Sequence, residues 1–208
     1  MDFFSNTNIQ LYLLAYLIGS IPFGMLIAKI FANVDIRDSG SGSIGATNVL
    51  RVLKDSNPNL AKKLAIATIL LDAFKGVFVL IIALIVGVDE GILWTIAIMA
   101  VLGHCFSLFL WFEGGKGVAT GMGVMMFMLP FVTIGALVAW GLSAKFIKIS
   151  SLSSIIGVIA LVVFSFVIHP TLEPIHTHAP VIIISILILY KHLPNIFRLI
   201  QGKEGQVV

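Results

Sequence analysis

Apolar residues occur in long runs along this chain, and short polar segments separate them. A run of about 20 apolar residues can cross a bilayer as a helix, because a helix satisfies its own backbone hydrogen bonds. The pattern therefore predicts spanning helices, the first of them kinked by Pro22. The apolar runs extend over Ile9 to Phe31, Leu64 to Val88, Ile92 to Phe112, Val118 to Ile147, Leu152 to Ile168 and Pro180 to Tyr190.

The run from Val118 to Ile147 is about 30 residues long, which is too long for one simple crossing. We divide it near Pro130 to Gly135 into two short helices, each about 15 residues and about 22 Å long. With this division and the N-terminus outside, the 13 Lys and Arg residues all lie at or near cytoplasmic ends. The positive-inside rule thus favours an all-α bundle of seven crossings, with the N-terminus outside and the C-terminus inside.

Composition supports a membrane protein, since 59% of the 208 residues are hydrophobic and only 11% are charged. A soluble domain of this length carries more charge on its surface. No long polar segment is present, so we expect one transmembrane domain over residues 1–208. The basic cytoplasmic ends account for the net charge of +3. The charge therefore gives no reason to expect a nucleic-acid partner.

The polar segments 35–59, 113–117, 150–154 and 191–204 all fall on the cytoplasmic side of this topology, and we expect them to meet in one site. In the first, Gly40, Gly42 and Gly45 spell G-x-G-x-x-G. A dinucleotide fingerprint needs a preceding strand, which a membrane helix excludes. Glycines do allow backbone N–H groups to converge on an anion, beside the Ser41 and Ser43 hydroxyls and the Arg51 cation. A flexible linker is the alternative.

The second segment, WFEGGKGVAT, places Lys116 among glycines just before a predicted helix, and helix N-termini favour anions. It is not a nucleotide-binding loop, because Leu110 and Gly117 stand where that motif needs Gly and Ser or Thr. Phosphate binding or a tight interhelical turn would explain it. Deeper in the apolar runs, Asp72 and Lys75 are one helical turn apart and predict a structural ion pair lining the site.

Six segments in order resemble the bacterial acyl-phosphate:glycerol-3-phosphate acyltransferase family (PlsY type) over nearly the whole chain. These segments are GSIPFG, SGSIGATNVLR, LDAFKG, GHCFSLFLWFEGGKGVAT, SLSS and HLPNIFRLIQGKE. The resemblance implies a seven-helix enzyme of the bacterial inner membrane with its active site at the cytoplasmic face. It implies transfer of an acyl chain from acyl phosphate to the 1-hydroxyl of sn-glycerol 3-phosphate, giving lysophosphatidic acid and phosphate.

On the residues and the resemblance together, we assign three groups of site residues. The expected catalytic residues are Ser41, Arg51, Lys116, His192 and Asn195. The expected substrate-binding residues are Gly40, Gly42, Ser43, Thr47, Asn48, His104, Gly114, Gly115, Gly117 and Ser151. The expected supporting residues are Asp72, Lys75 and Glu204. Acyl phosphate is already activated, so we expect no cofactor and no metal.

The hypothesis for the reaction is direct attack by the glycerol hydroxyl on the acyl carbon, without an acyl-enzyme on Ser41. Arg51 and Lys116 would stabilise phosphate charge, while Ser41 and Ser151 would orient phosphate or the oxyanion. His192, held by Asn195, would be a base or a phosphate ligand, and the acyl phosphate itself is a second candidate proton acceptor.

Other classes of function remain open at this point. A membrane channel or transporter for phosphate or glycerol 3-phosphate is the main alternative, and a structural assembly subunit is another. An acyltransferase using thioesters would carry H-x-x-x-x-D, but Phe109 and Phe197 stand five residues after His104 and His192. The expected partners are acyl phosphate, glycerol 3-phosphate and membrane lipids, together with other enzymes of phospholipid synthesis.

Overall fold

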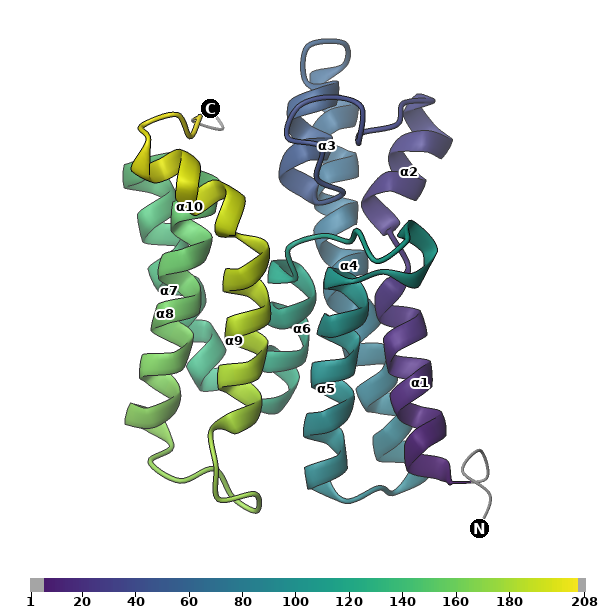
Figure 1. Cartoon of the computed structure of the whole chain (residues 1–208), viewed down its shortest axis with the longest axis vertical. Coiled ribbons are helices and arrows are strands. Elements are labelled where there is room, and N and C mark those ends of the chain that lie inside the picture. The colour runs from purple at the N-terminus through teal and green to yellow at the C-terminus, as the bar shows by residue number, and fades with distance from the viewer. Residues whose placement is uncertain (1–5, 206–208) are drawn as a thin grey trace.

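The computed structural model describes residues 6–205, which form an all-helical bundle (Figure 1). Within these residues, five spans are long and apolar enough to cross a membrane, which confirms the predicted fold class. In chain order the elements are α1 (Thr7–Ser20), α2 (Phe23–Ala32), α3 (Ala46–Leu53), α4 (Pro58–Val86), α5 (Glu90–Cys105), the 3₁₀ helix η2 (Leu108–Leu110), α6 (Val118–Met128), α7 (Pro130–Ile147), α8 (Ser150–Ile168), α9 (Ala179–Lys191) and α10 (Leu193–Ile200).

Two prolines divide apolar runs at the predicted places. α1 ends at Ser20 and α2 begins at Phe23, so the helix is interrupted at Pro22. Pro130 is the first residue of α7, after α6 has ended at Met128. Proline lacks the N–H that a helix interior needs but is tolerated in a first turn. The kink in the first run and the division of the long run are therefore confirmed.

The third apolar run was predicted to stay helical to Phe112, and this prediction was wrong. α5 ends at Cys105, and the chain folds back through η2 into a loop. Trp111 and Phe112 have φ values of 52° and 67°, which a right-handed helix cannot contain. The Phe112 N–H donates to the Ser107 carbonyl at 2.8 Å. Apolar composition alone did not reveal this turn.

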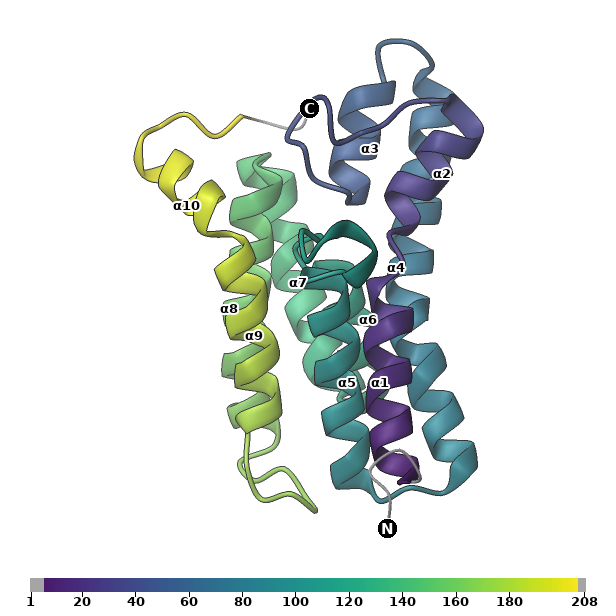
Figure 2. The same ribbon diagram turned by 45° about the vertical axis from the view of Figure 1, so that its right-hand side comes forward.

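The number of crossings depends on how three shorter helices are counted. α9 and α10 meet at 57° and together make a sixth candidate span. α6 has 11 residues and is about 17 Å long, which is shorter than a bilayer core. α1 begins at the lower end of the bundle and α10 lies at the upper end, as Figures 1 and 2 both show. Seven crossings and the orientation stay predictions.

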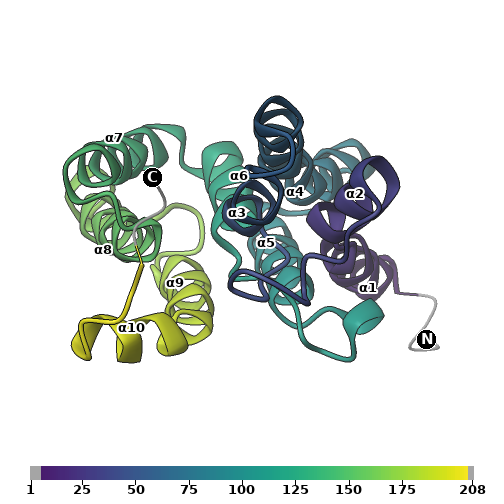
Figure 3. The same cartoon turned by 90° about the horizontal axis from the view of Figure 1, so that it is seen from above.

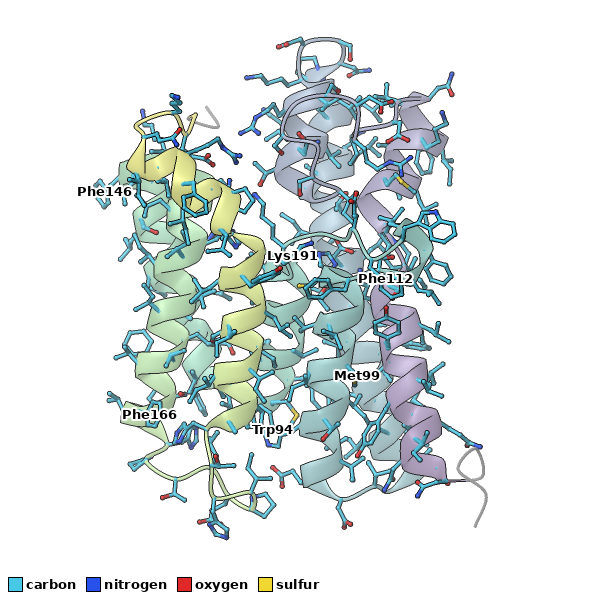
Figure 4. The ribbon with its side chains drawn as sticks, in the orientation of Figure 1. Trp94, Met99, Phe112, Phe146, Phe166 and Lys191 are labelled. Carbon is cyan, nitrogen blue, oxygen red and sulfur yellow. The ribbon has the colours of Figure 1, made fainter. Side chains whose placement is uncertain are left out.

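The helices form two groups when the bundle is seen from above (Figure 3). α7, α8, α9 and α10 lie on one side, α1 to α5 lie on the other, and α6 lies between them. The main core joins the groups through fully buried side chains such as Leu80, Ile96, Val124 and Ile184. Other large apolar side chains face outward, among them Phe146 and Phe166 (Figure 4), as lipid-facing side chains do.

A smaller core holds α3 against α4 at the upper end of the bundle. α3 buries Val49 and Leu53 in this cluster together with Ile27, Ile36 and Ala61. The eight-residue helix is strongly amphipathic, so burying this face fixes its rotation about its own axis. Its remaining face carries the polar residues of the site described next.

Candidate active site

A cavity of about 760 Å³ lies between the two helix groups, and residues from all the predicted polar segments line it. The structure therefore brings together side chains from distant parts of the chain, as expected. Of the predicted site residues, the lining includes Gly40, Ser41, Ser43, Thr47, Asn48, Arg51, Asp72, His104, Lys116, Gly117, Ser151, His192, Asn195 and Glu204.

Asn48 shapes the glycine segment before α3. Its Oδ1 accepts the Ser41 backbone N–H at 2.8 Å, and its Nδ2 donates to the Ile36 carbonyl at 2.7 Å. Gly40 has φ 65°, and a Cβ there would lie 2.2 Å from Asn48 Oδ1, so this position requires glycine. The buried Asn48 side chain thus holds Ser41 at the cavity wall. It also occupies the Ser41 amide, which the anion-nest hypothesis had left free. Gly42 lies in the same segment but not among the lining residues.

Three helices begin at the cavity wall. Gly45 to Thr47 at the start of α3, Gly117 to Ala119 at the start of α6, and Ser150 with Ser151 at the start of α8 all line it. The first N–H groups of a helix lack intrahelical partners and form the positive end of its dipole. Thr47 and Ser150 also bring α3 to α8, with their hydroxyl oxygens 3.3 Å apart. The arrangement favours anions from three directions.

Three cations line the same part of the cavity: Arg51, Lys116 and Arg198. Burial lowers the pKa of the Lys116 ammonium to about 8, against the opposing attraction of Glu204. Arg198 and Arg51 lower this pKa further by repulsion. An incoming phosphate would relieve that repulsion, because an opposite charge favours the charged form of lysine.

Glu204 accepts hydrogen bonds from three side chains of the site with its carboxylate. Its Oε1 accepts from the Ser151 hydroxyl at 2.7 Å and from Asn195 Nδ2 at 2.6 Å, while its Oε2 accepts from Arg198 Nε at 2.6 Å. Partial burial opposes ionisation, but these hydrogen bonds outweigh it and lower the pKa of Glu204. Glu204 therefore fixes α8 and α10 relative to each other.

His192 lies at the junction of α9 and α10 and is almost fully buried. Its Nδ1 lies 2.8 Å from the Ile188 carbonyl, so a proton on Nδ1 leaves Nε2 as an acceptor. We predicted that Asn195 holds this ring, and the structure shows another arrangement. Asn195 donates to Glu204, and the backbone carbonyl of Ile188 orients His192.

Gly114 and Gly115 do not line the cavity. Their N–H groups donate to the Cys105 and His104 carbonyls at 3.2 and 2.9 Å. A Cβ on Gly115 would lie 2.3 Å from His104 Nε2, and one on Gly114 would lie 2.1 Å from the His104 carbonyl oxygen. The two glycines allow close packing on His104, and this geometry does not support the substrate-binding role predicted for them.

Asp72 and Lys75 form the predicted ion pair on α4. Asp72 Oδ1 lies 2.9 Å from Lys75 Nζ, close enough for an ion pair but without hydrogen-bond geometry. Lys75 Nζ also donates to the Ile21 carbonyl at 2.8 Å, at the break between α1 and α2. Asp72 and His104 line the cavity, whereas Lys75 does not.

The sequence interpretation missed two parts of this cavity. Arg198 was not among the predicted site residues, although it lies one helical turn after Asn195 and shares its face. The cavity also has an apolar arm between α6, α7 and α8, which no polar motif marks. This arm is lined by Met122, Met125, Ala136, Leu137, Trp140, Gly157, Val158 and Leu161.

Comparisons with known proteins agree on one family. Residues 9–202 match the family described as Glycerol-3-phosphate acyltransferase. A protein of that name from Sulfurimonas denitrificans is 64% identical over 208 residues, covering 100% of both chains. Another of that name, from Campylobacter concisus, is 59% identical and covers 97% of this chain and 99% of its own.

Two crystal structures of PlsY, an integral membrane glycerol 3-phosphate acyltransferase, have the same fold. The glycerol 3-phosphate form has a TM-score of 0.85 and 37% identity, covering 97% of this chain and 96% of its own. The lysophosphatidic acid form has a TM-score of 0.83 and the same identity, covering 97% and 95%.

Proposed function

Because the chain belongs to the glycerol-3-phosphate acyltransferase family, we propose that it acylates the 1-hydroxyl of sn-glycerol 3-phosphate with acyl phosphate as donor. The products are lysophosphatidic acid and inorganic phosphate. As a member of this family the chain is an acyltransferase, and the identity of the donor is the new element of the proposal.

One observation supports this donor: a single cavity combines a polar end lined by anion-binding groups with an apolar arm. Three helix N-termini and three cations line its polar end, and one of these cations, Arg198, is paired with Glu204. Helix N-termini and cations both bind phosphate. The arm between α6, α7 and α8 offers an apolar surface for an acyl chain. A donor that carries both a phosphate and an acyl chain fits the two regions together.

The reaction is direct acyl transfer. The glycerol hydroxyl oxygen forms a bond to the acyl carbon, and the bond from that carbon to the phosphate oxygen breaks, so that phosphate leaves with the electron pair. Lys116 binds the phosphate of glycerol 3-phosphate, and Arg51 binds that of the donor. Ser41 and Ser151 orient the reacting groups. Fixed cations and dipoles stabilise the developing charge without reorganisation.

The hydroxyl proton goes either to His192 Nε2 or to the leaving phosphate. The hydrogen bond to Ile188 gives His192 an acceptor nitrogen at the cavity wall, which supports the first route. A His192→Ala variant separates the two. A large loss of kcat with little change in either KM supports His192 as the base, whereas nearly unchanged turnover assigns the proton to phosphate.

We place this site at the cytoplasmic face of the bacterial inner membrane. The basic residues of the sequence cluster at the ends of the helices that carry the site, as the positive-inside rule requires of the cytoplasmic side. One substrate is lipid-soluble and the other is water-soluble, and a cavity with a polar end and an apolar arm suits both.

The test is an assay of the purified full-length protein with labelled glycerol 3-phosphate and three donors: acyl phosphate, acyl-CoA and the thioester of acyl carrier protein. We expect lysophosphatidic acid from acyl phosphate alone. Product from a thioester in the absence of acyl phosphate would contradict the proposal. Flux of phosphate or glycerol 3-phosphate through protein-containing vesicles without lipid product would favour the transporter alternative.

A further inference from the structure

Three charged or titratable side chains meet below the active-site loop and take no part in the proposed chemistry. Asp72, Lys75 and His104 are each at most 4% exposed. Asp72 Oδ1 lies 3.7 Å from His104 Nδ1, which has no hydrogen-bond partner in residues 6–205. Buried polar groups are costly unless paired. A cluster of this kind, next to the cavity, therefore suggests a role beyond packing.

His104 is also the surface on which loop 113–117 lies. The loop N–H groups at 114 and 115 donate to backbone carbonyls at 105 and 104, and the His104 ring fits where a Gly115 side chain would be. Lys116 is the next residue along the chain and lines the cavity. The position of the ring therefore limits how far the loop, and with it Lys116, can descend toward α4.

Asp72 lies beside the ring, and Lys75 pairs with Asp72. Lys75 is held by the Ile21 carbonyl, and the Thr120 hydroxyl donates to the Asp72 carbonyl at 2.8 Å. These contacts tie α4 both to the break between α1 and α2 and to α6, so they hold the part of α4 that carries Asp72. From there it lies beside one edge of His104, whose other edge supports Gly115.

We propose that His104, supported by Asp72 and Lys75, is a positioning residue that sets the place of the Lys116 ammonium in the cavity. This inference rests on the proposed function, in which Lys116 binds the phosphate of glycerol 3-phosphate. In this proposal His104 positions Lys116, whereas the sequence had predicted that His104 binds substrate directly. It also explains why two glycines without cavity contacts precede the lysine.

The test adds a methyl group at Gly115, removes the ring of His104, and then combines the two substitutions. Gly115→Ala pushes the loop away from the ring, and His104→Ala removes the support, so each should raise the KM for glycerol 3-phosphate about tenfold. The double variant places the new methyl group in the space that the ring leaves. Its KM should therefore be lower than that of either single variant, a coupling that independent sites do not show.

A pH profile gives a second readout, because His104→Ala admits water beside the loop. Water beside Lys116 reduces the effect of burial on its pKa. The fall of kcat/KM for glycerol 3-phosphate at alkaline pH should then move to higher pH. The groups that face Lys116 are unchanged in this variant, namely Glu204, Arg198, Arg51 and His192. The matched control is Thr68→Val on α4, since the buried Thr68 hydroxyl donates only to Leu64 one turn earlier. Its kinetics should match the wild type.

Additive effects of the two substitutions, or unchanged KM values for both substrates in Gly115→Ala, would overturn the positioning role. A rise in the KM for acyl phosphate alone would support positioning but reassign the phosphate that Lys116 binds. Lack of activity with acyl phosphate in the wild type would instead contradict the proposed function.

Discussion

The Ser151 hydroxyl donates to the Glu204 carboxylate at 2.7 Å, which ties the first turn of α8 to the chain segment that follows α10. The two residues are 53 positions apart. Because Asn195 and Arg198 donate to the same carboxylate, one side chain near the C-terminal end of the described chain organises one wall of the cavity.

Replacing Glu204 should therefore disturb three site residues at once. Glu204→Gln removes the charge that holds Arg198, so we expect kcat/KM to fall about tenfold to a hundredfold, as loss of hydrogen bonds to a charged group implies. Steady-state kinetics measure this. Glu113→Gln is the matched control, because Glu113 is exposed and lies outside the cavity lining. Equal kinetics for the two variants would contradict the role of Glu204.

Lys116 predicts an alkaline limit to activity. Burial lowers its pKa to about 8, so the ammonium is charged below that pH and neutral above it. Since kcat/KM reports the free enzyme, kcat/KM for glycerol 3-phosphate should fall as pH rises through about 8. Arginine stays charged, so Lys116→Arg should move this limb to higher pH even if it lowers the rate. Lys145→Arg, at an exposed position, should leave the limb unmoved.

Asn48 predicts a structural cost with a functional consequence. Asn48→Asp keeps the acceptor for Ser41 but loses the donor to the Ile36 carbonyl, which leaves a buried group unpaired at a cost of about 1–3 kcal/mol. We expect a lower Tm in detergent and at least about tenfold lower kcat/KM, since misplaced reacting groups slow catalysis. Ser143→Ala, which removes a hydroxyl bonded only to Trp140 on its own helix, should change neither. An unchanged Tm would argue against the anchoring role.

The apolar arm predicts control of acyl-chain length. Ala136 lines it from α7, so Ala136→Phe should fill part of its volume and raise the KM for long-chain acyl phosphates more than for medium-chain ones. Competition between two donors in one assay measures this preference. Val138→Phe, on the outward face of the same helix, should leave it unchanged. The same preference in both variants would place the acyl chain elsewhere.

Local features of the sequence were enough to predict most helices. Apolar runs of sufficient length predict helices in a membrane, because the bilayer offers the backbone no other hydrogen-bond partners. Pro22 and Pro130 marked real helix breaks, because proline lacks the backbone N–H that a helix interior needs. The end of α5 at Cys105 and the beginning of α4 at Pro58 were missed, since caps and turns depend on single side chains such as Asn57, which accepts from the Leu60 N–H at 3.1 Å.

The sequence by itself determined that the chain is a membrane helix bundle and which polar segments belong together. Only the tertiary structure decided what each polar residue does there. Gly115 supports a loop instead of lining the cavity, Arg198 enters the site, and Ile188 instead of Asn195 orients His192. The reason is physical: helix formation follows from hydrogen bonds and hydrophobicity over a few turns, whereas the burial of Lys116 and the partners of Glu204 depend on helices far apart in the chain.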